Sequence, residues 1–172
     1  MHGRVMTDAA MTASPDLIDP VRRARVEALL AEYAHCIDDD RLEQWPDFFA
    51  QTCRYRVVTR ENFDRDLPLS LIYCDSKGML ADRISALRTA NIFEPHVYCH
   101  ITGAARVWSE GGELRARSNF TIVRTMANGE ASIFACGKYL DCVVEDAGAL
   151  KFRERIAVLD SRQIDTLLVI PV

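Results

Sequence analysis

Residues 120–158 read FTIVRTMANGEASIFACGKYLDCVVEDAGALKFRERIAV, and this stretch decides the fold. It lies in the last third of the chain, from about Val97 to Ile170, where strand-like segments alternate with turn signals. Asn-Gly and Gly-Gly pairs supply the positive φ that tight hairpin turns require. The turn signals are Ser109–Gly112, Met126–Gly129 and Glu145–Gly148. The sequence therefore predicts long antiparallel strands joined by tight turns.

The spacing of these turns allows strands of about a dozen residues, or roughly 40 Å at about 3.3 Å per residue. Strands of that length curl because sheet twist accumulates along them. Helical patterns come early in the chain and strands come late, which is typical of an α+β fold. We therefore expect a long, curved antiparallel sheet wrapped around the N-terminal helices.

Two helices are predicted. Asp19 is a good N-cap and Pro20 a good first residue for a helix whose apolar stripe runs from Val26 to Ile37. The second helix runs from Ser76 to about Asn91. We expect both helices to lie in the concave side of the sheet.

Segments around these helices complete the prediction. Aromatic residues between the helices, Trp45, Phe48 and Phe49, predict a plug for one end of the core. Residues 60–69, which are charged and contain a proline, predict a loop.

Length and composition point to one domain. The chain has 172 residues, a net charge of −4 and 49% hydrophobic residues, which is ordinary for a globular protein. Residues 1–15 are expected to be a mobile tail and residues 16–172 a single domain. The acidic balance argues against nucleic-acid binding.

Exported and membrane-bound proteins are also disfavoured. The longest apolar run, residues 167–170, is too short to span a bilayer, and no signal peptide is evident, so a cytoplasmic protein is expected. The six cysteines include no C-x-x-C pair, which favours reduced and mostly buried thiols.

Motifs for cofactor or metal chemistry are sparse. His96, Cys99 and His100 would converge on a helix, but Pro95 favours a strand, where Cys99 points away from the two histidines. Two histidines alone do not make a zinc or iron site. The chain also lacks the C-x-H…C-x-x-H arrangement of a Rieske cluster, a G-x-G-x-x-G motif, a P-loop and a nucleophile elbow.

One acid–base group remains as an alternative. Tyr33, His35 and Asp38 lie near the end of the first helix, and with His100 from the sheet they would line the mouth of a pocket. A stand-alone dehydratase or isomerase would use such a group. Otherwise Tyr33 belongs to the core, and His35 and Asp38 face solvent. A small-ligand binding module is a third option.

Extended segments spread along the chain resemble the small (beta) subunits of aromatic-ring-hydroxylating dioxygenases. Three segments carry the resemblance. The first is Met79–His96, the second runs from Asp38 through Glu43–Phe49 to Cys53–Val57, and the third is Glu154–Ser161, followed by Asp165–Leu168. The resemblance covers about residues 20–172 and looks nearest to the branch acting on aromatic acids such as terephthalate, salicylate, anthranilate or benzoate.

The resemblance implies a cystatin-like cone and a structural role. It implies a large (alpha) subunit that holds the Rieske [2Fe-2S] cluster and the non-haem iron and binds the aromatic substrate. It also implies an α3β3 hexamer with a trimer of small subunits, served by an NADH-dependent reductase and sometimes a ferredoxin. No cofactor and no catalytic residue is then expected in this chain.

An assembly subunit needs contact surfaces. In residues 151–158, alternation places Lys151, Arg153 and Arg155 on one strand face. Arginine charges and the apolar tail are the candidate contacts with other subunits, with the tail forming an edge strand or a subunit contact. These candidates are Arg83, Arg88, Arg153, Arg155, Leu167, Leu168 and Ile170.

Overall fold

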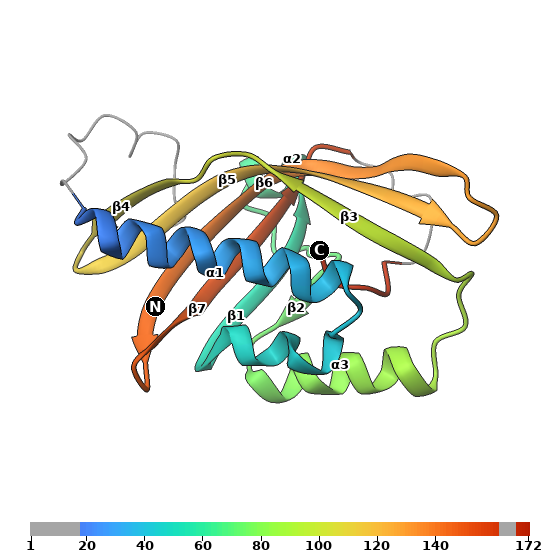
Figure 1. Cartoon of the computed structure of the whole chain (residues 1–172), viewed down its shortest axis with the longest axis horizontal. Helices are drawn as coiled ribbons and strands as arrows, with labels where there is room; N and C mark the ends of the chain where they lie inside the picture. Colours follow the sequence, from blue (N-terminus) through green and yellow to red (C-terminus); the bar gives the residue numbers. More distant parts are fainter. Residues whose placement is uncertain (1–17, 162–167) are drawn as a thin grey trace.

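A strongly curved seven-stranded sheet dominates the structure, a computed structural model that describes residues 18–161 and 168–172 (Figure 1). The expected tail, residues 1–15, lies outside the described residues. The strand order is β2-β1-β7-β6-β5-β3, and β4 also pairs with β5. The strands are β1 (Phe49–Thr59), β2 (Ile72–Cys74), β3 (His96–Thr102), β4 (Arg106–Glu110), β5 (Glu113–Met126), β6 (Ala131–Asp146) and β7 (Ala149–Leu159).

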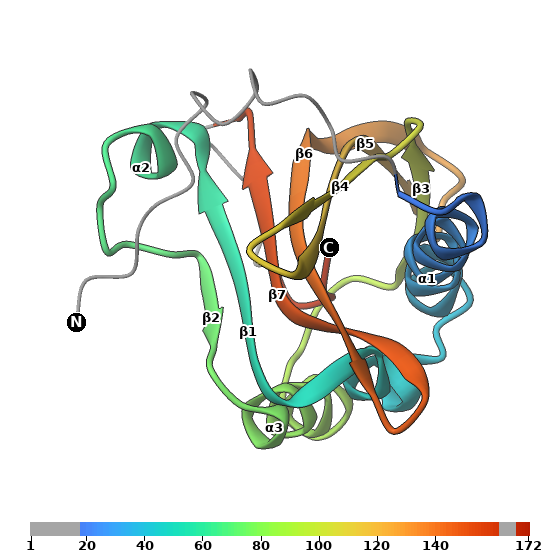
Figure 2. The same ribbon diagram turned by 90° about the vertical axis from the view of Figure 1, so that its left-hand side faces the viewer.

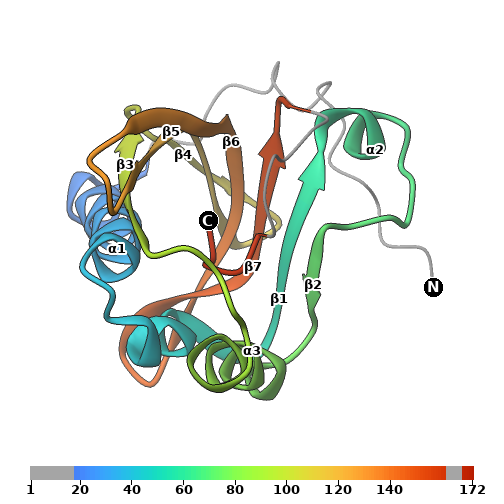
Figure 3. The same ribbon diagram turned by 90° about the vertical axis from the view of Figure 1, so that its right-hand side faces the viewer.

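The late strands confirm the predicted hairpins. Strands β5, β6 and β7 have 14, 16 and 11 residues. The turns between them use backbone with positive φ, at Gly129 (φ 87°) and Gly148 (φ 80°). Glycine adopts this conformation without the steric cost of a Cβ atom. The resulting sheet curls around an interior, as Figures 2 and 3 show from the two sides.

One strand pair is parallel, which the sequence did not predict. Strand β1 runs parallel to β7, with Val57 opposite Ala157, whereas the other pairs are antiparallel. The two strands are separated by most of the chain, and no turn joins them. A hydrophobic pattern sets which face of a strand is buried but does not select its partner.

A β-bulge in β7 overturns the predicted strand face. Between Phe152 and Glu154, β7 carries one residue more than the facing β6, and the extra residue is Arg153. A bulge of this kind shifts the alternation of all later side chains. Arg155 therefore points inward like Phe152. The prediction that Lys151, Arg153 and Arg155 share one face is wrong for Arg155.

The helices follow the predicted ends closely. α1 spans Pro20–Asp38, with the Asp19 carboxylate accepting a hydrogen bond from the Arg22 amide, and it lies across the concave side of the sheet (Figure 1). α3 spans Lys77–Thr89 and begins after the Ser76 cap. Residues 60–69, predicted to be a loop, begin with the short helix α2 (Arg60–Asp64). The Thr59 hydroxyl accepts a hydrogen bond from the Asn62 amide and so caps α2.

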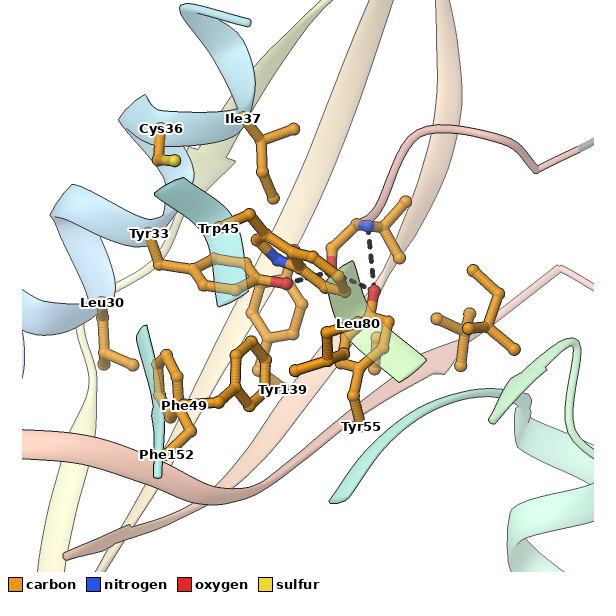
Figure 4. Packing of buried hydrophobic residues seen from close by; sticks show 14 of the residues in the cluster. Leu30, Tyr33, Cys36, Ile37, Trp45, Phe49, Tyr55, Leu80, Tyr139 and Phe152 are labelled. Atoms are coloured by element: carbon orange, nitrogen blue, oxygen red, sulfur yellow. Dashed lines mark hydrogen bonds between the residues drawn. The ribbon is translucent and has the colours of Figure 1, made fainter. Parts of the chain in front are cut away.

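Aromatic side chains fill the space between α1 and the sheet. The 3₁₀ helix η2 (Leu42–Phe48) brings Trp45 into the interior, where it packs edge-on against Phe49 and Tyr55 (Figure 4). Tyr33 from α1 packs in the same way against Phe152 from β7. Edge-to-face packing of this kind adds to the stabilisation from burial alone. The predicted aromatic plug is confirmed.

Gly137→Ala should destabilise the sheet strongly. An added Cβ at Gly137 would overlap the carbonyl oxygen of Val158 and approach the Cα atom of Leu159 at 3.2 Å, so the β7 backbone would have to move. We expect a loss of about 1–3 kcal/mol in the free energy of unfolding, measured by chemical denaturation. Gly103→Ala is the matched control, because its Cβ would meet its nearest neighbour at an ordinary 3.7 Å. Equal losses in the two variants would refute this explanation.

Candidate functional site

An ion pair is buried at the centre of the interior. Nη1 of Arg155 donates to both carboxylate oxygens of Asp141, at 3.0 and 2.9 Å, and their side chains are 1% and 0% exposed. The guanidinium lies 4.0 Å from the ring centre of Tyr33 and 3.8 Å from that of Tyr139. Burial raises the pKa of Asp141 to about 6, and the charge of Arg155 opposes that rise. The pair belongs to the core, so we do not assign Arg155 to an intersubunit contact.

The proposed acid–base group is divided among three places. Asp38 binds His100, with 2.5 Å between Oδ1 and Nδ1 and 2.8 Å from Oδ2 to the His100 backbone nitrogen. This contact ties the end of α1 to β3. Tyr33 instead donates its hydroxyl hydrogen to the carbonyl oxygen of Val172, inside the core. His35 lies on the exposed side of α1, 3.9 Å from a glutamate oxygen. Only Asp38 and His100 meet.

The His96–Cys99–His100 segment forms a strand, as predicted. Cys99 is exposed, and the side chain of His100 is fully buried on the other face. Within residues 18–161 and 168–172, no cluster of three or more His, Cys, Asp or Glu side chains is suited to hold a metal ion. The six cysteines all lie in described positions and are free thiols, four of them buried.

Two of the candidate interface arginines are exposed and already paired within the chain. Arg88, near the end of α3, donates to Glu43 at 2.8 Å and to Asp40 at 3.0 Å. The hydrogen bonds from Glu43 and then Asp40 raise the pKa of Arg88. Arg153, the bulge residue, pairs with Glu113. Both arginines can still present their remaining surface to another subunit.

The apolar tail enters the interior of its own chain, so the predicted edge strand is absent from residues 168–172. Val169, Ile170 and Val172 are buried, and Leu168 is half-buried. The end of the chain lies inside the curl of the sheet (Figures 2 and 3). Arg83 bonds this segment through the carbonyl oxygen of Leu168, so it serves an intrachain contact. Leu167 lies outside the described residues.

An uncharged patch covers the outer surface of three strands. We call it the outer face, and it comprises Val97, Cys99 and Ile101 of β3, Thr121, Val123 and Thr125 of β5, and Ile133 and Cys136 of β6. These residues are neighbours in the strand register, with Cys99 opposite Val123 and Val123 opposite Ile133. Val97, Ile101 and Ile133 are 60%, 58% and 72% exposed. Apolar residues gathered in this way are typical of a protein–protein contact surface.

Sequence reasoning missed two features of the interior. Asp141 gave no signal as the partner of Arg155, because the two residues meet only through strand pairing. The contact of Tyr33 and Tyr55 with Val172 joins residues more than 100 positions apart. The residues of the outer face were not among the contacts predicted from the sequence. Its alternating pattern in 97–101 was the signal that would have located it.

Asp141→Asn should destabilise the protein by about 3–5 kcal/mol, because it leaves the guanidinium of Arg155 buried without a counter-charge. The double variant Asp141→Leu/Arg155→Met removes both charges and should recover most of that loss. Denaturation of the single variants Asp141→Leu and Arg155→Met and of the double variant gives the coupling free energy. Additive losses would show that the pair contributes no coupling.

Comparisons with known proteins agree with the fold. The family model described as ring hydroxylating beta subunit matches residues 32–166. The chain is 43% identical over 152 residues to the terminal oxygenase subunit beta 2 of terephthalate 1,2-dioxygenase from Comamonas sp, covering 88% of this chain and 99% of that protein. It is 40% identical over 141 residues to the anthranilate 1,2-dioxygenase small subunit of Burkholderia cepacia, covering 81% and 88%.

A solved structure extends the agreement to three dimensions. A beta subunit assigned to an aromatic-ring-hydroxylating dioxygenase of Novosphingobium aromaticivorans superposes with a TM-score of 0.80 at 39% identity, covering 88% of this chain and 97% of that one. The cone fold is thereby confirmed, and the subunit interpretation is supported over the stand-alone dehydratase or isomerase. The chain belongs to the family of ring-hydroxylating dioxygenase beta subunits.

Proposed function

We propose that this chain is a non-catalytic assembly subunit of a multicomponent aromatic-ring-hydroxylating dioxygenase. It supports a large subunit that carries the Rieske cluster and the mononuclear iron, within a cytoplasmic α3β3 complex. Electrons reach the large subunit from NADH through a reductase, with or without a ferredoxin. The relatives act on terephthalate and anthranilate, which favours an aromatic acid as the substrate of the complex.

The closed interior is the observation that carries this proposal. In the curl of the sheet, where a cone-shaped enzyme would bind its substrate, this chain packs Trp45, Tyr55, the Arg155–Asp141 pair and the segment 168–172. The Asp38–His100 pair remains, but the other members of the acid–base group do not join it. An interior filled in this way favours a role through surfaces, since a cone fold by itself does not imply catalysis.

The outer face is the surface that best suits such a role. Its apolar side chains are exposed in the single chain and would be shielded from water in a complex. Arg88 and Arg153 lie on the surface and remain candidates for contacts with other subunits. In the described part of the chain, no helix is both long and apolar enough to cross a membrane.

Co-expression with a large subunit carrying C-x-H…C-x-x-H tests the proposal. We expect the two chains to purify together, with iron and aromatic-acid hydroxylation present only when the large subunit is present. The measurement is iron content per chain together with turnover in the presence of NADH and the reductase. Stoichiometric iron in this chain alone, or turnover of an aromatic acid by this chain alone, would refute a non-catalytic role.

Ile133→Asp tests the outer face. A carboxylate placed within an apolar contact would be buried without a partner, so incorporation into the complex should fall about tenfold or more. Ile92→Asp is the control, because Ile92 is 98% exposed in the loop before β3 and lies outside the outer face. Analytical size exclusion of both variants with the large subunit measures incorporation. Equal incorporation of the two variants would rule out the outer face as a contact surface.

A further inference from the structure

A row of side chains crosses the outer side of the sheet, opposite the side that α1 covers (Figure 1). Its members face one another in the strand register, one on each of β4, β5, β6, β7, β1 and β2. We call it the arginine row, and it comprises Arg106, Arg117, Leu140, Ile156, Arg56 and Tyr73, in that order. Side chains alternate between the two sides of a strand, and the adjacent Val107, Ala116 and Val57 are buried in the core. The arginine row therefore points outward.

The arginine row adjoins the outer face. Arg117 and Thr121 lie on the same side of β5, and Leu140 and Cys136 lie on the same side of β6. The register between the two strands runs without a shift from Arg117 opposite Leu140 to Thr121 opposite Cys136. The outer side of the sheet thus carries an apolar part and a basic part that meet along β5 and β6. A chain that covers the outer face reaches the arginine row.

Two arginines of the row have no carboxylate partner in the part of the chain that the structure describes. Arg106 is exposed, and its guanidinium lies 5.6 Å from the ring centre of Trp108. Nε of Arg56 donates to the hydroxyl oxygen of Ser70 at 3.3 Å. Within residues 18–161 and 168–172, neither Arg106 nor Arg56 forms an ion pair. Their positive charges remain available to another chain.

Arg106 also stands directly opposite Arg117 in the β4–β5 pair. Like charges in directly opposite positions destabilise a sheet. A carboxylate supplied by another chain would offset this repulsion. The residue types agree with such a contact, because Arg, Tyr and Trp are enriched where proteins meet. Tyr73, at the far end of the row, is 47% exposed.

The spacing of the arginines describes the partner that would fit. Arg106 and Arg117 lie on adjacent strands, and Arg56 lies three strands beyond Arg117. Strands are about 4.8 Å apart, so roughly 14 Å along the sheet separates these two positive regions. Leu140 and Ile156 occupy the interval. Arginine binds carboxylates through paired N–H donors, so a fitting partner carries carboxylates at both ends and an apolar group between them.

We propose that the arginine row is the electrostatic part of the docking surface for the large subunit, and that it receives carboxylates of that subunit. The outer face supplies the apolar part of the same contact. The arginines fix the orientation of the partner and speed association, as charges around an interface do. The net charge of −4 disfavours a polyanion such as nucleic acid as the occupant. This inference rests on the proposed function.

Neutralising two arginines tests the inference. The complex of the large subunit with Arg56→Gln/Arg106→Gln is compared with that of the unchanged chain. Analytical ultracentrifugation gives the dissociation constant at about 50 mM and about 500 mM NaCl. We expect the variant to raise the dissociation constant about tenfold or more at the lower salt. The difference should nearly vanish at the higher salt, because screening weakens the ionic contacts in the unchanged complex too.

Two further variants serve as controls. Arg22→Gln/Arg23→Gln removes two exposed charges from α1, away from the outer side of the sheet, and should leave the dissociation constant within about twofold. Arg56→Lys/Arg106→Lys keeps both charges and should keep the salt dependence of the unchanged complex.

Equal dissociation constants for Arg56→Gln/Arg106→Gln and the unchanged chain at the lower salt would overturn the inference. A loss that persists undiminished at the higher salt would also overturn it, because structural damage is not screened. A changed self-association of this chain, with unchanged binding of the large subunit, would assign the arginine row to a second copy instead. Failure of the unchanged chain to bind the large subunit would refute the proposed function and this inference together.

Discussion

One buried ion pair connects the parts of this cone. Arg155 sits between the rings of Tyr33 from α1 and Tyr139 from β6, and Asp141 neutralises its charge. The pair forms only because the bulge at Arg153 turns Arg155 inward. A guanidinium buried among aromatic rings needs a counter-charge beside it, since an unpaired charge in this environment is strongly destabilising. The position of α1 across the sheet is thereby coupled to the register of β6 and β7.

The interior of this cone is filled by the chain's own side chains. A catalytic pocket needs space for a substrate and polar groups that meet around it. Here Tyr33 is engaged with Val172, His35 lies outside, and only Asp38 and His100 pair. In contrast to the filled interior, the surface carries an uncharged patch, the outer face, across β3, β5 and β6. Within a ring-hydroxylating oxygenase, this division suits the assembly role that we propose for the chain.

The donors around Val172 hold the end of the chain in the interior. Buried main-chain oxygen atoms need hydrogen-bond donors, and Tyr33, Tyr55 and Arg83 supply them for residues 168–172. These hydrogen bonds join residues 168–172 to Tyr33 of α1, Tyr55 of β1 and Arg83 of α3.

The sequence by itself determined the local structure and the family. Asp19 and Ser76 begin their helices, the glycines of the three turn signals set the hairpins, and the apolar stripe of α1 faces the interior. These features depend on neighbours a few residues apart, and such short-range preferences are written directly in residue type. Motifs distributed along the chain likewise identified a ring-hydroxylating beta subunit before any contact was known.

Only the tertiary structure decided which distant residues meet. Three contacts join residues that no local sequence pattern relates. They are the parallel pairing of β1 with β7, the Arg155–Asp141 pair, and the hydrogen bonds of Tyr33 and Tyr55 with Val172. A single extra residue at Arg153 was enough to move Arg155 from the predicted surface to the core. Strand alternation has a period of two, so one bulge reverses every side chain beyond it, and its position is set by packing across the sheet.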